Sequence, residues 1–259
     1  MHGWAAGHRT VAWRAEDYGG AVPKVRLLTY NVRGLHDDPD AVATVVRRCQ
    51  PDVLVVQEGP RRFRWRPRCA ALARACGLFY VAGGRTAGGN VLFATARVRV
   101  HAILERRMPV PLGAPMRGIV AATLSVEGTR FRVVGVHLSL GASERALEVT
   151  QVLAAAQLES GLPLLVAGDL NEGPTGPSWA AFARAGLRDV CAGDSARPTY
   201  PAHAPRARID GVLVSNPDVD VLRAGVPTDP DLRPLLSRAS DHLPVLAELV
   251  VSEPPPDRL

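Results

Sequence analysis

The sequence predicts a mixed α+β fold in which two sheets pack against each other and helices lie outside them. Three observations predict this class. Apolar and β-branched runs of strand length outnumber the helical patterns. Several of these runs are close enough in sequence to form hairpins. The 259 residues are enough for one large domain with a substantial core, and no internal repeat or mid-chain linker interrupts them.

The pattern becomes regular at residue 25. Residues 25–32 (VRLLTYNV) predict a strand, and Asp38 and Pro39 are suited to the first turn of a helix that follows it. The apolar face of this helix is formed by Val42, Val45 and Val46. Residues 53–56 are a continuous apolar run, as expected for a strand that is covered on both faces.

The remaining elements alternate along the chain. A helix over residues 67–76 is expected to end at Gly77, and a long helix over 143–159 to be capped by Ser143. Residues 119–126 and 130–138 flank a glycine-containing turn as a hairpin, and a short helix covers 178–185. The other strands are expected at residues 79–82, 91–94, 98–104, 164–167, 209–214, 219–222 and 245–251.

The expected organisation is a loose arm over residues 1–22, one domain over 23–252 and a frayed tail over 253–259. No stretch approaches the roughly eighteen consecutive apolar residues of a membrane span. The first twenty residues lack the apolar region of a secretory signal. We therefore expect a soluble, cytoplasmic, monomeric protein.

The chain is basic, with 31 basic and 25 acidic residues and a formal charge of +6. A basic balance is typical of proteins with phosphate-bearing partners. However, every basic residue except Lys24 is an arginine, a bias that GC-rich codon usage also produces. The position of the arginines is therefore more informative than their number.

The four cysteines, Cys49, Cys69, Cys76 and Cys191, contain no C-x-x-C pair, which argues against a structural zinc site. Cys69 and Cys76 lie two helical turns apart, about 10 Å, which is too far for a disulfide. Scattered free thiols suit a reducing compartment.

Polar residues that can bind metal or phosphate recur where the expected strands end. They are Asn31, Glu58, His137, Asp169, Asn171, Asp210, Asp241 and His242. Side chains at strand ends project from a rigid scaffold and can converge on one cleft. Carboxylate and amide oxygens are the ligands that Mg²⁺ and Mn²⁺ prefer, and a nearby carboxylate or imidazole can orient an attacking water. The set therefore suits metal-assisted attack on a phosphate ester.

Each member of the set also has an ordinary structural explanation. Asn31 suits a turn, His137 suits a satisfied position in a hairpin, and Asp210 has Arg206 and Arg208 nearby as ion-pair partners. Taken singly, most of these explanations are the better ones. The ordered recurrence of the whole set at strand ends favours a functional site.

The same residues resemble the endonuclease/exonuclease/phosphatase superfamily, which has the deoxyribonuclease-I-like fold. The segment TYPAHAPRARID resembles the small bacterial branch of this superfamily. The blocks that match the superfamily occur in its order over residues 25–250. They are TYNVRG at Asn31, VVQE ending at Glu58, GN at Asn90, VHLSL at His137, GDLN from Asp169 to Asn171, RIDGVLVS at Asp210, and SDHLPV at Asp241 and His242.

The resemblance implies a four-layered α/β/β/α sandwich of two mostly antiparallel sheets, with a catalytic domain over residues 23–252. It implies that Glu58 ligates Mg²⁺, or alternatively Mn²⁺, with Asn31 and Asp241 in or near the same shell. Asp210 is then expected to pair with His242, which contacts the scissile phosphate.

By the same resemblance, Asp169 and Asn171 position the nucleophile and stabilise the transition state, and His137 binds a phosphate oxygen. Some nucleases of this fold pair that histidine with a glutamate to form a general acid. This chain has Asn90 near the corresponding place, so His137 is not expected to donate the proton.

The implied activity is divalent-metal-dependent hydrolysis of phosphodiester bonds. The segment after Glu58, RRFRWRPR, adds arginines that suit phosphates and aromatic rings that can stack a base. Candidate substrate-binding residues are therefore Arg61, Arg62, Arg64 and Trp65 from this segment, and Asn90 from the matching block GN. Alternatively, the aromatic rings of this segment pack under the next helix. The segment favours a nuclease acting on DNA or RNA over a sphingomyelinase-like phosphohydrolase of lipid or small phosphoesters. A catalytically inactive binding module is the least favoured alternative, because binding does not need the complete set.

Overall fold

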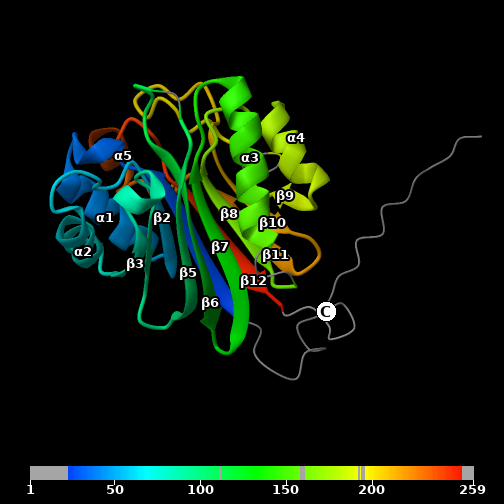
Figure 1. Ribbon diagram of the computed structural model, residues 1–259. Coiled ribbons are helices and arrows are strands. Elements are labelled where there is room, and N and C mark those ends of the chain that lie inside the picture. Colours follow the sequence, from blue (N-terminus) through cyan, green and yellow to red (C-terminus); the bar gives the residue numbers. More distant parts are fainter. Residues whose placement is uncertain (1–22, 111, 158–160, 192, 194–195, 253–259) are drawn as a thin grey trace, which may run out of the picture.

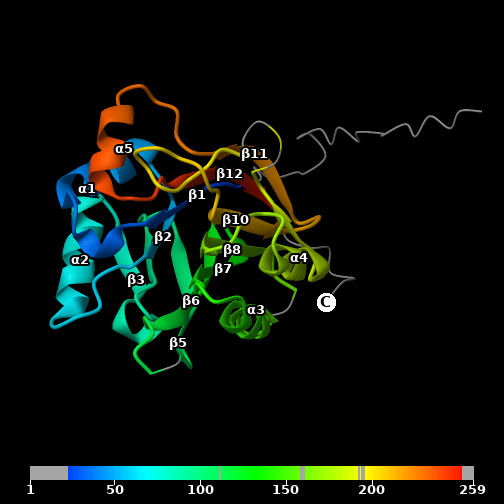
Figure 2. The same cartoon turned by 90° about the horizontal axis from the view of Figure 1, so that it is seen from above.

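The computed structural model describes residues 23–110, 112–157, 161–191, 193 and 196–252. Two six-stranded sheets pack face to face, and helices cover the outer side of each (Figures 1 and 2). The four-layered α/β/β/α sandwich is therefore confirmed. The expected arm and tail lie outside the described residues, so the domain limits stay a prediction.

The first sheet has the strand order β11-β12-β1-β2-β4-β3. Its only parallel pair is β1 with β2, in which Leu27 lies opposite Val53. The strands are β1 (Lys24–Asn31), β2 (Val53–Gln57), β3 (Phe79–Gly83), β4 (Val91–Ala94), β11 (Val219–Gly225) and β12 (Val245–Val251).

The second sheet has the strand order β5-β6-β7-β8-β10-β9. Its only parallel pair is β7 with β8, in which His137 lies opposite Asp169. The strands are β5 (Arg99–Met108), β6 (Arg117–Val126), β7 (Thr129–His137), β8 (Leu164–Asp169), β9 (Leu187–Asp189) and β10 (Asp210–Ser215). Each sheet thus has one parallel pair at its centre, and the polar residues follow the carboxyl ends of these pairs.

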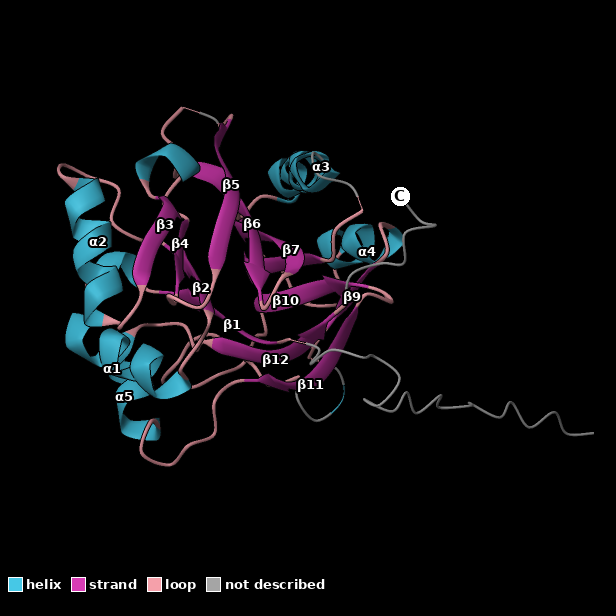
Figure 3. Ribbon diagram, turned by 90° about the horizontal axis from the view of Figure 1, so that it is seen from below, coloured by secondary structure: helices cyan, strands magenta, loops and turns pink. Residues whose placement is uncertain are grey.

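The helices divide between the two outer faces (Figures 2 and 3). Three cover the first sheet: α1 (Pro39–Cys49), α2 (Trp65–Ala75) and α5 (Arg233–Ala239). Two cover the second: α3 (Ala142–Gln157) and α4 (Pro177–Arg184). The expected cap of the first helix is present, since Asp38 accepts the backbone N–H of Ala41 at 2.9 Å.

The core has three layers, one between the sheets and one under each set of helices. Val55, Phe131 and Leu165 are fully buried between the sheets. Phe93 lies under α1 and α2, and Phe182 anchors α4 on the second sheet. Alternate residues of the central strands therefore enter different layers, which explains their continuous apolar runs.

Several expected element limits are wrong. The second helix begins at Trp65 rather than residue 67, and the third at Ala142, so Ser143 lies inside it. The Ser143 hydroxyl donates to the Glu144 carboxylate and does not cap the helix. The short strand β9 and the helix α5 were not expected, because neither has enough residues to show a period.

All four cysteines are free and buried, as expected. Among the described residues, no helix has the length and apolar character needed to cross a membrane.

The two sheets approach closely at Gly135 of β7. A Cβ atom at this position would lie 2.7 Å from Val55 Cγ1 of the facing sheet and 2.9 Å from Val120 Cγ1. We predict that Gly135→Val lowers the free energy of unfolding by about 1–3 kcal/mol, because the added side chain forces the layers apart. Urea denaturation measures the effect. Gly173→Ala is the matched control, since nothing lies within 4 Å of a Cβ there. Equal stability of the two variants would contradict this account of the interface.

Candidate active site at the carboxyl ends of the central strands

Asn31, the last residue of β1, joins the two sheets at one edge. Its Nδ2 donates to Asp169 Oδ2 at 3.0 Å and lies 3.3 Å from Glu58 Oε1. Its side-chain oxygen accepts the backbone N–H of Arg33 at 3.0 Å, which fixes the amide orientation. Glu58 directly follows β2 in a left-handed conformation (φ 54°) and is half-buried. One amide thus holds two carboxylates from different sheets.

Asp169, the last residue of β8, is 1% exposed. Its Oδ1 accepts the backbone N–H of Asn171 at 2.9 Å, and the Asn171 side chain donates to the Leu138 carbonyl at 2.8 Å. Burial, with the nearby Asp210 carboxylate, raises the pKa of Asp169 to about 7. This carboxylate is therefore able to exchange a proton near neutral pH.

Asp210 and His242 form a buried pair across the interface between the sheets. His242 Nδ1 lies 2.9 Å from Asp210 Oδ2 and 3.2 Å from Oδ1. Burial by itself would lower the pKa of His242, but the Asp210 carboxylate overcomes this effect and raises it to about 9. The other ring nitrogen, Nε2, lies 3.7 Å from Asp169 Oδ2. His242 is therefore a cation that faces the centre of the site.

His137, the last residue of β7, approaches the same carboxylate from the other side. Its Nε2 lies 3.4 Å from Asp169 Oδ2. Burial, reinforced by the positive charge of Arg117, holds the pKa of His137 well below its ordinary value. The two histidines that flank Asp169 thus differ in charge at neutral pH.

Three residues that sequence reasoning missed support the charged pair. The Thr199 hydroxyl accepts the backbone N–H of Asp210 at 3.2 Å. The Ser240 hydroxyl donates to the Asn31 carbonyl at 2.7 Å and accepts the His242 backbone N–H at 3.3 Å. The Tyr200 ring packs 4.8 Å from the His242 ring. Ser240 belongs to the block SDHLPV, which was the one signal for it.

A buried ion network braces the loops after β7 and β8. Arg145 of α3 binds Glu172 at 2.9 Å and donates to the Ser139 carbonyl at 3.1 Å. Glu148 accepts the Ser139 backbone N–H at 2.7 Å, and Glu172 accepts the N–H of Ser178 at the start of α4. The residues that follow His137 and Asn171 are therefore held by the helices of the second layer.

Arg117, the first residue of β6, is a further residue that sequence reasoning missed. It is 6% exposed, and its Nε has no hydrogen-bond partner within the described part of the chain. Burial lowers its pKa, while the charges of Glu148, Asp169 and Glu58 oppose this effect. Its Nη1 donates to the Met116 carbonyl at 3.3 Å. A charged residue at the start of an otherwise apolar strand was the only sequence signal.

Two predicted residues lie beside this cluster with other partners. Asp241 is half-buried, and its Oδ2 lies 3.4 Å from Arg33 Nε. Asn90 is buried and donates to the Gly118 carbonyl at 2.7 Å rather than to His137. The alternative ion pair of Asp210 is wrong, because Arg208 pairs with Asp189 instead.

The arginine-rich segment divides into a packed part and an exposed part. Trp65 is half-buried against Gly84, and the guanidinium of Arg66 stacks 4.2 Å from its ring. Phe63, in contrast, is 85% exposed, and its neighbours Arg62 and Arg64 are exposed as well. Arg61 lies against Gly89, and its charge contributes to the lowered pKa of His137. Phe63 is therefore an open ring, whereas the Trp65 ring is partly packed.

Two groups of residues have the donor atoms for a metal. Ligand atoms of Asp169, Asp210 and His242 lie within 4.8 Å of one another. The second group is formed by the carboxylates of Glu58 and Asp169, which both contact the Asn31 amide and offer only oxygen donors.

The family model of the endonuclease/exonuclease/phosphatase family matches residues 28–242, which include every residue of this cluster. The chain belongs to this family. Its members are hydrolases, many of them phosphodiesterases or phosphatases. The chain is 30% identical over 142 residues to the protein YbhP of Escherichia coli, and the match spans 54% of that relative and 53% of this chain.

Solved structures of family members share the fold. An endonuclease/exonuclease/phosphatase family protein from Bacteroides thetaiotaomicron has a TM-score of 0.72 at 21% identity, covering 89% of this chain and 98% of that one. The mannosyl-6-phosphatase Bt3783 of the same organism has a TM-score of 0.67 at 20% identity, covering 87% and 99%. TDP2 of D. rerio, complexed with a single-strand DNA product, has a TM-score of 0.68 at 18% identity, covering 87% and 98%.

The charge of His242 is predicted to depend on Asp210. In Asp210→Asn the main cause of the raised pKa is lost while the burial remains, so the pKa of His242 should fall from about 9 to below its ordinary value of 6.5. NMR titration of the imidazole C–H signals in EDTA measures it. His101, which bonds to Ser125 away from the site, is the internal control. A His242 pKa that stays above 8 in the variant would contradict the assignment.

Proposed function

We propose that this protein is a divalent-metal-dependent phosphodiesterase with nuclease-like action. The observation that carries the proposal is the set of contacts around Asp169, where an amide, a backbone N–H, a neutral histidine and a charged histidine converge on one buried carboxylate. This combination provides a proton acceptor, a cation and neutral hydrogen-bonding groups within one cluster, which hydrolysis of a phosphate ester requires.

A hard divalent cation fits between Glu58 and Asp169. The Asn31 N–H now lies between the two carboxylates, and a position that two carboxylates share suits a cation at least as well. A cation at this position would offset the free-energy cost of ionising the buried Asp169 carboxyl group. Asp210 and His242 are less suited to Mg²⁺, because an imidazole is a poor ligand for it and their facing atoms bond to each other. Glu58 and Asp169 would thus hold Mg²⁺ or Mn²⁺, with Asn31 and Asp241 near the shell.

When bound, the metal polarises the phosphoryl group and offsets its developing charge. Asp169, held by the Asn171 N–H, orients the attacking water and accepts its proton. His242, kept protonated by Asp210, places a positive charge against the equatorial phosphate oxygens. Neutral His137 donates a hydrogen bond to another of these oxygens.

Arg117 completes the phosphate-binding set. A buried guanidinium costs several kcal/mol unless it is paired. The three carboxylates that act on Arg117 do so through charge at a distance, since none of them forms an ion pair with it among the described residues. A substrate phosphate would supply the partner that this side chain lacks.

A polynucleotide is the substrate class that the rim of the site favours. Phe63 is an exposed aromatic ring between the exposed Arg62 and Arg64, directly after the segment that carries Glu58. Rings of this kind stack on bases, and guanidinium groups bind the phosphates between them. TDP2, which shares this fold, is complexed with a single-strand DNA product.

The central test is Glu58→Gln, assayed on DNA, RNA, bis-p-nitrophenyl phosphate and sphingomyelin with Mg²⁺, Mn²⁺ or EDTA. We expect the parent to cleave DNA or RNA with Mg²⁺ and to be inactive in EDTA. The variant should lose about 10³-fold in kcat/KM at an unchanged Tm, because it removes a charged ligand from the surface of a rigid scaffold. Activity in EDTA would refute the metal, and cleavage of sphingomyelin alone would favour the lipid alternative.

Replacing Arg117 distinguishes a role of this side chain in binding the substrate phosphate from a role in stabilising the fold. Arg117→Met should reduce kcat/KM on every cleaved substrate by about 10²-fold, because a phosphate contact is lost. Its Tm should stay the same or rise, because a buried charge without a partner disappears. Kinetics and calorimetry on one preparation measure both effects. A lower Tm at full activity would mean that Arg117 serves the fold.

The aromatic rim is tested by comparing two rings. Phe63→Ala should raise KM on a polynucleotide severalfold and leave bis-p-nitrophenyl phosphate turnover unchanged, since the small diester does not reach the rim. Trp65→Ala should instead lower the Tm, because its ring is packed. Equal losses on polymer and small diester in Phe63→Ala would remove the argument for a nucleic-acid substrate.

A further inference from the structure

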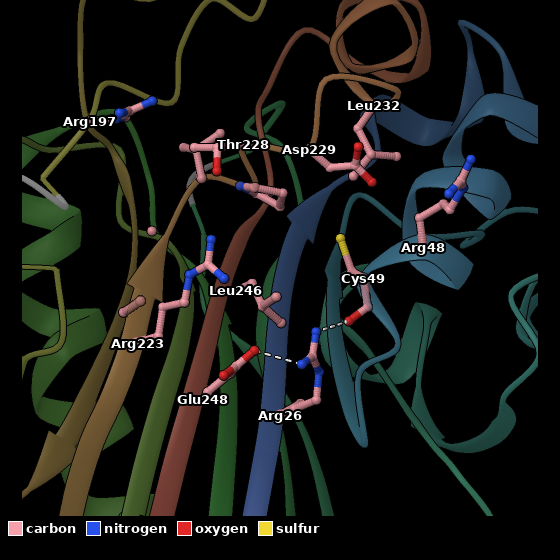
Figure 4. A pocket seen from close by; sticks show the side chains of 14 residues that line it. Arg26, Arg48, Cys49, Arg197, Arg223, Thr228, Asp229, Leu232, Leu246 and Glu248 are labelled. Atoms are coloured by element: carbon pink, nitrogen blue, oxygen red, sulfur yellow. Dashed lines mark hydrogen bonds and ion pairs between the residues drawn. The ribbon is translucent and has the colours of Figure 1, made fainter.

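A basic pocket lies outside the catalytic cluster, on the helix-covered side of the first sheet. Its volume is about 370 Å³, and none of its lining residues belongs to the catalytic cluster. The walls come from β1, β11 and β12, from the end of α1 and from the loop that leads to α5 (Figure 4). This volume is within the range of small-molecule sites, which begins near 300 Å³.

Four arginines and two carboxylates line the pocket. Their ion pairs do not neutralise all four arginines, so the pocket keeps an excess of positive charge. Arg26 is neutralised by Glu248, at 2.6 Å. Arg48 pairs with Asp231 at 3.3 Å, but both side chains are more than half exposed, so this pair contributes little. The second lining carboxylate, Asp229, accepts the backbone N–H of Asp231 at 3.0 Å.

Arg197 and Arg223 have no carboxylate partner among the residues that the structure describes. Figure 4 shows both on the side of the pocket opposite Arg48, with Thr228 near them. Two unpaired guanidinium groups and a hydroxyl on one wall are suited to a dianion that accepts several hydrogen bonds.

The rest of the lining is apolar. Leu246 lies centrally in Figure 4, and Leu232 and Val226 belong to the same hydrophobic cluster that anchors α1 and α5. Burial raises the pKa of the Cys49 thiol to about 11, so this residue adds a neutral, unreactive surface. A ligand of this pocket therefore carries an apolar or aromatic body in addition to its anionic group.

We propose that this pocket binds a small phosphomonoester with an apolar or aromatic body. The phosphate, which carries nearly two charges at neutral pH, would lie against Arg197 and Arg223, and the body would lie over Leu246 and Leu232. The binding needs neither the catalytic metal nor the catalytic residues, so it is independent of the proposed function.

The test is calorimetric titration of the full chain in EDTA with AMP, and with adenosine as the uncharged probe. AMP should bind with one-to-one stoichiometry, and adenosine at least about tenfold more weakly, because it lacks the phosphate. Arg223→Ala and Arg197→Ala should each weaken AMP binding about tenfold. Thr228→Trp should abolish it by filling the cavity without changing the charge.

Two controls locate the binding. Arg107→Ala removes an exposed arginine of β5 on the other sheet and should leave AMP affinity unchanged. His242→Ala should also leave it unchanged, which separates this pocket from the catalytic cluster. The proposal is overturned if AMP does not bind, if adenosine binds equally well, if Arg197 and Arg223 are both dispensable, or if His242→Ala abolishes the binding.

Discussion

The arrangement of the site depends on one constraint: the Asp169 carboxylate is buried, and neighbouring groups must compensate its negative charge. Burial opposes its ionisation, and so does Asp210 beside it. The surrounding groups counter this penalty through the Asn171 N–H, the Asn31 amide and the charge of His242. Each of these groups is itself fixed by a further hydrogen bond, to Leu138, Arg33 and Asp210 respectively. The polar cluster is therefore a connected network rather than a row of separate ligands.

The two central parallel pairs explain why the network lies where it does. Elsewhere the sheets are antiparallel, so neighbouring strands end at opposite edges. Only in a parallel pair do both carboxyl ends meet at one edge, and each sheet has one such pair. The sandwich then places Asn31 and Glu58 from one sheet against His137 and Asp169 from the other.

Much of this arrangement could be predicted from the sequence, because the signal was local. A polar residue at the end or start of an apolar strand is visible in a few letters, so Asn31 and Asp169, which end β1 and β8, and Asp210, which begins β10, were found with their strands. The contacts between them were not visible, since Asn31 and Asp169 are 138 residues apart. The pairing of Asp210 with His242 was expected only from the family resemblance.

Other features depend on packing, which sequence patterns do not record. Arg117 appears in the sequence as one more arginine among thirty, and neither its burial nor its place beside the carboxylates of the site is visible there. In the same way, the sequence left open whether the Trp65 ring stacks a base or packs under the next helix, and its contact with Gly84 shows that it packs. Whether an aromatic ring is free or packed is decided by residues that lie elsewhere in the chain.

The Ser240 hydrogen bond to the Asn31 carbonyl has a consequence for how the protein loses activity. It ties the loop that carries His242 to the first sheet, whereas Asp210, the partner of His242, belongs to the second. The Asp210–His242 pair and the Asn31–Asp169 contact therefore both cross the boundary between the two layers. The site exists only while the sheets keep their relative position, so inactivation by heat or denaturant should coincide with global unfolding rather than precede it as a local event.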